Sequence, residues 1–225
     1  MTKSEDFKMK PKLILFDMDG TLTNSGQGIV NSAQYALRKY GKEVEDLSEL
    51  TCFIGPPLPK QFEIFCGFSE EESLRAVSYF REYYVEKGIY ENSVYDGIRE
   101  LLTTLRDAGF KLAVATSKPE KLALVVTEYF DLTKYFDFVG GSLMSGGRTV
   151  KAEVIAHVLS KFEDIDKDEV VMIGDTHYDV IGAKEIGLHS IGVLYGYGKK
   201  EDIENAHPDY IAKTPAEIGE YLLSK

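Results

Sequence analysis

The stretch Leu13-Ile14-Leu15-Phe16-Asp17-Met18-Asp19-Gly20-Thr21-Leu22 joins a continuous apolar run to a pair of carboxylates. An apolar run without alternation is typical of a strand buried on both faces, as in a parallel sheet. Strand side chains alternate between faces, so Asp17 and Asp19 project toward the same region if the extended geometry continues past Phe16. Gly20 permits a tight turn directly after the pair. The stretch therefore predicts a buried parallel strand that ends in an acidic site.

Further apolar runs repeat this pattern along the chain, at residues 112–115, 136–139, 170–173 and 190–193, with a weaker one at 209–211. Helical spacing of apolar residues separates the runs; one example starts at Ile98 and ends at Leu105, with Gly109 after it as a helix-ending glycine. The alternation of strands and helices predicts an α/β fold, an open parallel sheet with helices on both faces.

Residues 23–92 break this rhythm, because they contain no buried-strand pattern. Amphipathic helical patterns run from Ile29 to Tyr40, from Gln61 to Cys66 and from Glu70 to Lys87, and a proline-rich loop at 55–59 interrupts them. An insertion of this length is a separate module that could act as a lid. We therefore predict a helical cap domain at 23–92 and a core domain formed by 1–22 and 93–225.

The chain has 225 residues, with 26 Lys and Arg against 37 Asp and Glu, and a formal net charge of −11. This acidity argues against nucleic acids and anionic membranes as partners, because both are bound mainly by Lys and Arg. No apolar run approaches the ~20 residues of a membrane span, and the charged N-terminus lacks the apolar stretch of a signal peptide. Cys52 and Cys66 are too few for a disulfide scaffold. We expect a cytoplasmic protein, with monomer and homodimer both open.

Three more polar segments lie near the predicted strands. Gly174-Asp175-Thr176-His177-Tyr178-Asp179 follows the run 170–173, Thr116-Ser117-Lys118-Pro119-Glu120 follows the run 112–115, and Lys151 precedes an amphipathic helix. Ligands of open α/β sheets bind at the carboxyl ends of the strands, so these segments are expected to meet there. Ser117 and Glu120 have the spacing of a capping box, which predicts a helix N-terminus that attracts phosphate.

The clustered carboxylates need a cation, since each one raises the pKa of its neighbours. Lys151 is one source of positive charge. Hard oxygen ligands in a cramped site favour Mg²⁺, which also accepts a phosphate oxygen.

The four segments resemble the motifs of the haloacid dehalogenase-like (HAD) superfamily, and specifically of its aspartate-nucleophile phosphatases. Residues 17–21 resemble motif one, Thr116 motif two, Lys151 motif three and residues 174–179 motif four. The resemblance covers nearly the whole chain. The helical insertion resembles the small cap of the phosphoglycolate phosphatase and β-phosphoglucomutase branch. The resemblance implies a Rossmann-like core with the motif-bearing strands at the centre of the sheet.

The resemblance also implies a reaction: Mg²⁺-dependent hydrolysis of a small phosphorylated metabolite, such as phosphoglycolate, through an aspartyl phosphate. Asp17 would be the nucleophile, and Asp19 the general acid and then the general base. The implied catalytic set also contains Thr116 and Lys151, which would hold the phosphoryl oxygens. The implied substrate-binding residues are Gly20, Thr21, the Ser117 amide and, in the cap, Gly55. The implied metal set is Asp17, the Asp19 backbone carbonyl, Asp175 and Asp179, the last one orienting the water shell.

Several alternatives stay open from the sequence. A β-phosphoglucomutase-like phosphotransferase shares the motifs and the cap. The apolar loop 53–57 offers few contacts for the carboxylate of phosphoglycolate, so a nucleoside monophosphate phosphatase (5′-nucleotidase) or a sugar phosphatase also stays open. The non-enzymatic alternative is a phosphate-binding regulatory module, which has no need of Asp19. Lys118 is expected either at the mouth of the crevice or on an exposed first helical turn. The segment Tyr195-Gly196-Tyr197-Gly198 is expected either at the border of the entrance or in a turn with packing duties only.

Overall fold

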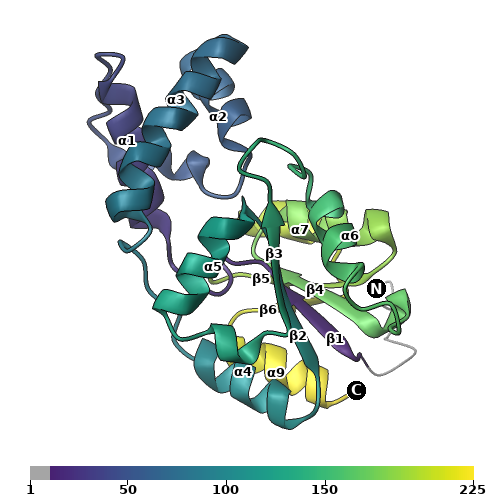
Figure 1. Cartoon of the computed structure of the whole chain (residues 1–225). Coiled ribbons are helices and arrows are strands. Elements are labelled where there is room, and N and C mark those ends of the chain that lie inside the picture. Colours follow the sequence, from purple (N-terminus) through teal and green to yellow (C-terminus); the bar gives the residue numbers. More distant parts are fainter. Residues whose placement is uncertain (1–10) are drawn as a thin grey trace. The chain divides into compact units, whose positions relative to one another are not determined.

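A computed structural model describes residues 11–225 of the chain (Figure 1). Its sheet has six strands in the order β3-β2-β1-β4-β5-β6, and every neighbouring pair is parallel. The strands are β1 (Leu13–Phe16), β2 (Lys111–Pro119), β3 (Phe138–Ser142), β4 (Val170–Gly174), β5 (His189–Val193) and β6 (Tyr210–Ala212). The predicted open parallel sheet is therefore confirmed, and all four residues of β1 are buried as the apolar run requires.

The topology places a switch point beside β1. The chain leaves β1 for β2 and β3 on one side, and then crosses β1 to add β4, β5 and β6 on the other. In open α/β sheets, ligands bind at the carboxyl ends of the strands beside such a switch point. The motif-bearing strands β1, β2 and β4 are adjacent at the centre of the sheet, as expected.

Helices cover both faces of the sheet. They are α4 (Ile98–Asp107), α5 (Glu120–Tyr129), α6 (Lys151–Leu159), α7 (His177–Ile186), α8 (Lys200–Asn205) and α9 (Pro215–Leu223). Leu13 and Leu15 of β1 pack into a buried cluster with residues of α6 and α7, such as Val154 and Ala183. Figure 1 shows α4 and α9 side by side on the opposite side of the sheet from α6 and α7. The side chains on both faces of β1 are therefore buried, which explains why the strand is an unbroken run of apolar residues.

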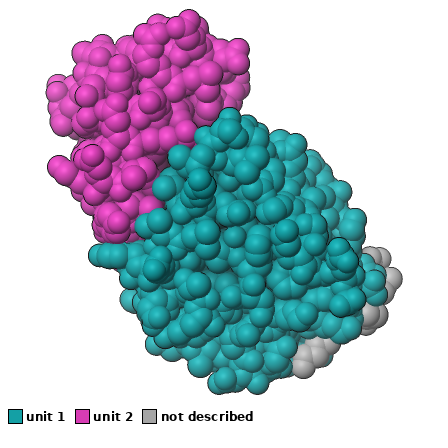
Figure 2. Space-filling model, in the orientation of Figure 1, with its two compact units in different colours: residues 1–22, 94–225 teal, residues 23–93 magenta. Residues whose placement is uncertain are grey.

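The chain divides into two compact units, residues 1–22 with 94–225 and residues 23–93 (Figure 2). The smaller unit contains α1 (Gly26–Arg38), α2 (Leu58–Cys66) and α3 (Glu70–Tyr83), with a short 3₁₀ segment at Leu47–Phe53. Its core is aromatic: the Phe53 and Phe62 rings lie 4.7 Å apart, and Phe80 stacks on Tyr84. The role of this unit as a cap stays a prediction.

The helix expected over 70–87 departs from its α form after Tyr83, where a π turn continues over Tyr84–Gly88. This turn packs on α1. A Cβ at Gly28 would lie 1.8 Å from the Gly88 carbonyl oxygen, so the two backbones touch where both residues lack a side chain.

Over the described residues, none of the helices is long and apolar enough to cross a membrane.

Candidate active site

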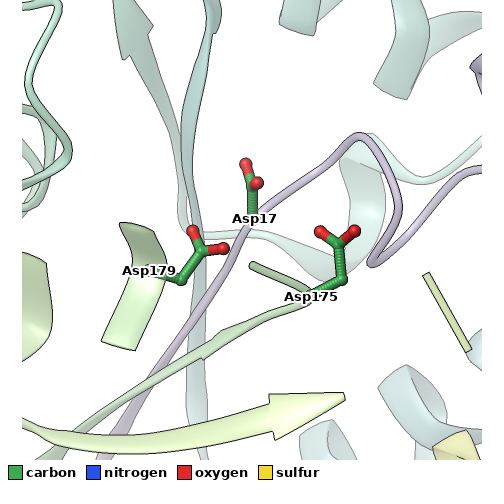
Figure 3. A group of neighbouring side chains, drawn as sticks. All are labelled: Asp17, Asp175 and Asp179. Atoms are coloured by element: carbon green, nitrogen blue, oxygen red, sulfur yellow. The ribbon is translucent and has the colours of Figure 1, made fainter. Parts of the chain in front are cut away.

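Three carboxylates meet at the carboxyl ends of β1 and β4 (Figure 3). Asp17 directly follows β1, Asp175 directly follows β4, and Asp179 lies in the first turn of α7. One oxygen from each residue lies within 4.8 Å of the other two, and all three side chains are buried. The sequence placed all three residues in one site, and the fold brings them together from separate segments.

Lys151, the first residue of α6, supplies a cation to this cluster. Its Nζ lies 3.1 Å from Asp17 Oδ1 and 2.7 Å from Asp179 Oδ1, and it donates to the Ala115 carbonyl at 3.3 Å. Burial by itself would lower the pKa of Lys151, but the two neighbouring carboxylates outweigh it and raise that pKa above its usual value. The ammonium group therefore stays charged inside the protein.

One lysine does not balance three buried carboxylates. Burial, with smaller repulsion from Asp179 and Asp19, raises the pKa of Asp17 to about 6, although Lys151 opposes the change. Burial and repulsion from Asp179 and Asp17 raise the pKa of Asp175 to about 8. The cluster therefore holds negative charge that the chain leaves incompletely compensated. Buried carboxylate oxygens at this spacing are a donor set that fits a small hard divalent cation.

Asp179 is held in place by the start of its own helix. Its Oδ2 accepts hydrogen bonds from the Thr176 backbone N–H at 3.1 Å and from the Thr176 hydroxyl at 2.8 Å. Its Oδ1 is the atom that contacts Lys151. Because protein donors already engage both oxygens, Asp179 is suited to orienting other groups at the cluster.

Asp19 is separate from the three-carboxylate cluster. Its Oδ2 lies 2.8 Å from Lys118 Nζ, with 13% and 4% of the two side chains exposed, and its Oδ1 is buried without a hydrogen-bond partner. The expectation of an exposed helical position for Lys118 is wrong, because β2 continues to Pro119 and carries Lys118 within the sheet. Sequence reasoning missed this pair; the only signal was a lysine two residues after Thr116.

The predicted capping box of Ser117 and Glu120 is also wrong. Helix α5 begins at Glu120, with Pro119 before it and no side-chain cap. Ser117 lies in β2, where its carbonyl accepts a hydrogen bond from the Ser142 hydroxyl at 2.8 Å. The Glu120 carboxylate contacts His157 Nε2 at 3.2 Å. The longer strand thus takes over the residues that the pattern assigned to a helix start.

The structure places Thr116, which follows the run 112–115, next to Asp17. It is buried in β2, its hydroxyl accepts from the Lys118 backbone N–H at 3.2 Å, and its hydrogen bond helps to lower the pKa of Asp17 against the effect of burial. His177 is the first residue of α7, and its ring packs on Tyr178. Gly55 belongs to the smaller unit, where its φ of 100° favours glycine. The part of Gly55 in substrate binding stays a prediction.

The loop after β1 and the loop after β5 both touch Asp175. Gly20 has a φ of 84°, and a Cβ there would lie 2.1 Å from Asp175 Oδ2. The Thr21 hydroxyl donates to Asp175 Oδ1 at 3.2 Å, and the Tyr197 backbone N–H donates to Asp175 Oδ2 at 2.8 Å. These contacts place residues 195–198 against Asp175 of the acidic cluster. No sequence motif predicted this contact.

A family model described as "Haloacid dehalogenase-like hydrolase" matches residues 14–193. Three curated relatives align with 94% of this chain. They are a 5′-nucleotidase of Pseudomonas aeruginosa (40% identical, 95% of its length), the tyrosine-protein kinase PtkA of Mycobacterium tuberculosis (37%, 72% of its length) and a phosphoglycolate phosphatase of Vibrio parahaemolyticus (30%, 96% of its length).

Among solved structures, a predicted phosphatase from Clostridium acetobutylicum is 44% identical and superposes with a TM-score of 0.93, covering 96% of this chain and all of the other. The family match covers the strands and helices that carry all four acidic and basic motif segments. This chain therefore belongs to the haloacid dehalogenase-like hydrolases and is an enzyme of their phosphatase type, a hydrolase that acts on phosphoric monoesters.

Proposed function

We propose that the protein is a Mg²⁺-dependent phosphatase that hydrolyses a small phosphorylated metabolite through an aspartyl-phosphate intermediate. The observation that carries the proposal is the division of the site into two parts. Asp17, Asp175 and Asp179 share one buried cluster with Lys151, whereas Asp19 is paired separately with Lys118. One carboxylate can thus act as nucleophile while another handles protons.

In the first step an Asp17 carboxylate oxygen attacks the phosphorus, and the bond to the leaving oxygen breaks. Asp19, which has to be protonated at the start of this step, donates that proton to the leaving oxygen, so the product leaves as an alcohol. In the second step Asp19 accepts a proton from water, whose oxygen attacks the phosphorus. Inorganic phosphate is released and the Asp17 carboxylate is restored. Thr116 and Lys151 hold the phosphoryl oxygens while their charge redistributes.

The residues that would hold Mg²⁺ are Asp17, Asp175 and the Asp19 backbone carbonyl, with Asp179 orienting the water shell. The support is the buried set of carboxylate oxygens, whose negative charge the single positive charge of Lys151 does not fully balance. The ion would neutralise charge on the cluster and on the phosphoryl group during transfer. Lys151 keeps the metal-free cluster from being wholly anionic.

For the substrate we propose a nucleoside 5′-monophosphate first and phosphoglycolate second. The 5′-nucleotidase relative is 40% identical to this chain, whereas the phosphoglycolate phosphatase relative is 30% identical. The apolar loop 53–57 agrees with this order, because it offers few groups for the carboxylate of phosphoglycolate. A mutase activity shares the same proposed phosphoenzyme and is separated only by assay. The cytoplasmic location is proposed with the substrate class.

The test is phosphate release by the full chain from AMP, phosphoglycolate and p-nitrophenyl phosphate, with isomerisation of β-glucose 1-phosphate measured in parallel. We expect the highest kcat/KM for AMP and a loss of about 10³-fold on chelation of Mg²⁺, since metal catalysis contributes several kcal/mol. Higher kcat/KM for phosphoglycolate would reverse the order of substrates. Isomerisation without net phosphate release would identify a mutase, and no turnover of any monoester would contradict the proposal as a whole.

A further inference from the structure

The segment Tyr195-Gly196-Tyr197-Gly198 has no place in the proposed reaction, yet its backbone lies against Asp175. The Tyr197 N–H donates to Asp175 Oδ2 at 2.8 Å. A Cβ at Gly196 would lie 2.3 Å from Asp175 Cβ and 2.4 Å from the Gly20 carbonyl oxygen. A Cβ at Gly198 would lie 1.9 Å from the Asp175 carbonyl oxygen. Neither position accepts a side chain unless the loop moves away from Asp175.

The same segment also reaches the loop after β1. The Tyr195 hydroxyl donates to the Thr21 carbonyl at 3.0 Å, and the Thr21 hydroxyl donates to Asp175 Oδ1 at 3.2 Å. The Tyr195 ring packs edge-on against Tyr95, with centroids 5.1 Å apart. One donor therefore contacts each Asp175 oxygen. The Tyr197 N–H bonds Oδ2 directly, and Tyr195 holds the backbone of Thr21, whose hydroxyl bonds Oδ1.

These contacts set the rotation of a carboxylate that has little freedom otherwise. Asp175 is buried, and its carboxylate lies beside those of Asp17 and Asp179 (Figure 3). Each of its oxygens accepts one hydrogen bond and keeps a further lone pair for another partner. Groups that orient a metal ligand in this way typically change metal affinity about 10–100-fold when they are removed.

We propose that the loop Tyr195–Gly198 is a positioning element for Asp175, which holds its carboxylate ready for a divalent cation in the cluster. The inference rests on the proposed Mg²⁺ site and deepens it. The loop lies behind Asp175 and touches no reacting atom in the proposed scheme, so its residues are positioning residues rather than catalytic ones.

The experiment measures Mg²⁺ affinity of the full chain, from the rise in melting temperature over a series of Mg²⁺ concentrations without substrate. Tyr195→Phe removes only the hydroxyl and keeps the ring against Tyr95. Gly196→Ala adds the Cβ that Asp175 and Gly20 exclude. The matched controls are Tyr129→Phe, at an exposed ring, and Gly219→Ala in α9, where the new Cβ meets only the end of the Leu101 side chain at 3.3 Å.

We expect the Mg²⁺ Kd to rise about tenfold in Tyr195→Phe and by up to about 100-fold in Gly196→Ala, with both controls at the parent value. A structural role alone would lower the melting temperature of the metal-free protein and leave Kd unchanged. Tyr195→Phe keeps the test decisive even if Gly196→Ala does not fold. Tight Mg²⁺ binding by Tyr195→Phe would overturn the positioning role alone, whereas no Mg²⁺ binding by the parent chain would overturn the proposed metal site as well.

Discussion

The ammonium of Lys118 and the carboxylate of Asp19 form an ion pair at 2.8 Å, and both side chains are largely withdrawn from water. The pair fixes Asp19 Oδ2 and leaves Oδ1, which is buried and has no hydrogen-bond partner, as the oxygen available for proton transfer. Asp17 has its own lysine, Lys151, so the proposed nucleophile and the proposed acid each have a separate cation. This separation would suit two chemically similar carboxylates to the different roles that we propose for them.

Replacing Lys118 with methionine should affect the reaction according to the leaving group. In Lys118→Met we expect kcat for AMP to fall by about 10²-fold, because Asp19 is no longer held for proton donation. The fall should be smaller for p-nitrophenyl phosphate, whose leaving group departs with little protonation. Lys134→Met, at an exposed ion pair, is the control, and its kcat on both substrates should equal that of the parent. Equal losses on both substrates would instead indicate damage to phosphoryl binding.

Replacing Asp17 with asparagine should abolish turnover and phosphoenzyme formation, because the amide is a very weak nucleophile. The expected loss in kcat is at least about 10⁴-fold, measured by phosphate release and by trapping of labelled phosphoenzyme. Thr116→Val should retain phosphoenzyme formation at a reduced rate, because it removes one hydroxyl that is proposed to hold the phosphoryl group. A fully active Asp17→Asn variant would remove Asp17 from the nucleophile role.

The metal-free protein should lose stability as pH rises. Folding raises the pKa of Asp17 from 3.8 to about 6 and that of Asp175 from 3.8 to about 8, both chiefly by burial. The folded state then binds more protons than the unfolded state between pH ~4 and ~8, so the free energy of unfolding decreases across that window as pH increases.

The matching variant is Asp175→Asn, which has no such charge to bury. Without metal, its melting temperature should exceed that of the parent by about 5 °C at pH 8, and the gap should close near pH 4. Excess Mg²⁺ should raise the melting temperature of the parent and not that of the variant. A gap that persists at pH 4 would mean that the stabilisation does not come from the charge of Asp175.

Removing the cation of the cluster should cost more than removing an exposed one. In metal-free protein, Lys151→Met leaves Asp17 and Asp179 without their common partner, and we expect a loss of about 3–5 kcal/mol in the free energy of unfolding. Lys200→Met breaks an exposed pair with Glu204 and should cost about 1 kcal/mol or less.

The double variant Lys151→Met/Asp179→Asn tests the cause of that loss. Neutralising Asp179 removes one of the two charges that Lys151 compensates. The free energy of unfolding of the double variant, measured with denaturant, should therefore be higher than that of Lys151→Met. Additive losses in the double variant would show that Lys151 contributes through packing rather than through charge.

Much of the sheet could be read from the chain because buried parallel strands demand continuous apolar residues. Leu13–Phe16 and Val170–Gly174 match their runs almost residue for residue. Strand β3 was less well located, since it spans Phe138–Ser142 and ends in small residues without an apolar pattern. A Cβ at Gly141 would lie 2.3 Å from the Lys118 carbonyl oxygen, so close packing against β2 dictates that composition.

The sequence by itself determined where the carboxylates of the candidate site lie: Asp17, Asp19 and Asp175 directly follow strands or lie in the turn after one. Only the tertiary structure decided the partners of these residues. Lys118 reaches Asp19 because β2 extends to Pro119. The Tyr195–Gly198 loop contacts Asp175 because β4 and β5 are neighbours and end side by side. Local patterns report burial and backbone form, which depend on nearby residues, whereas ion pairs and backbone contacts between distant segments depend on how strands align and where each one stops.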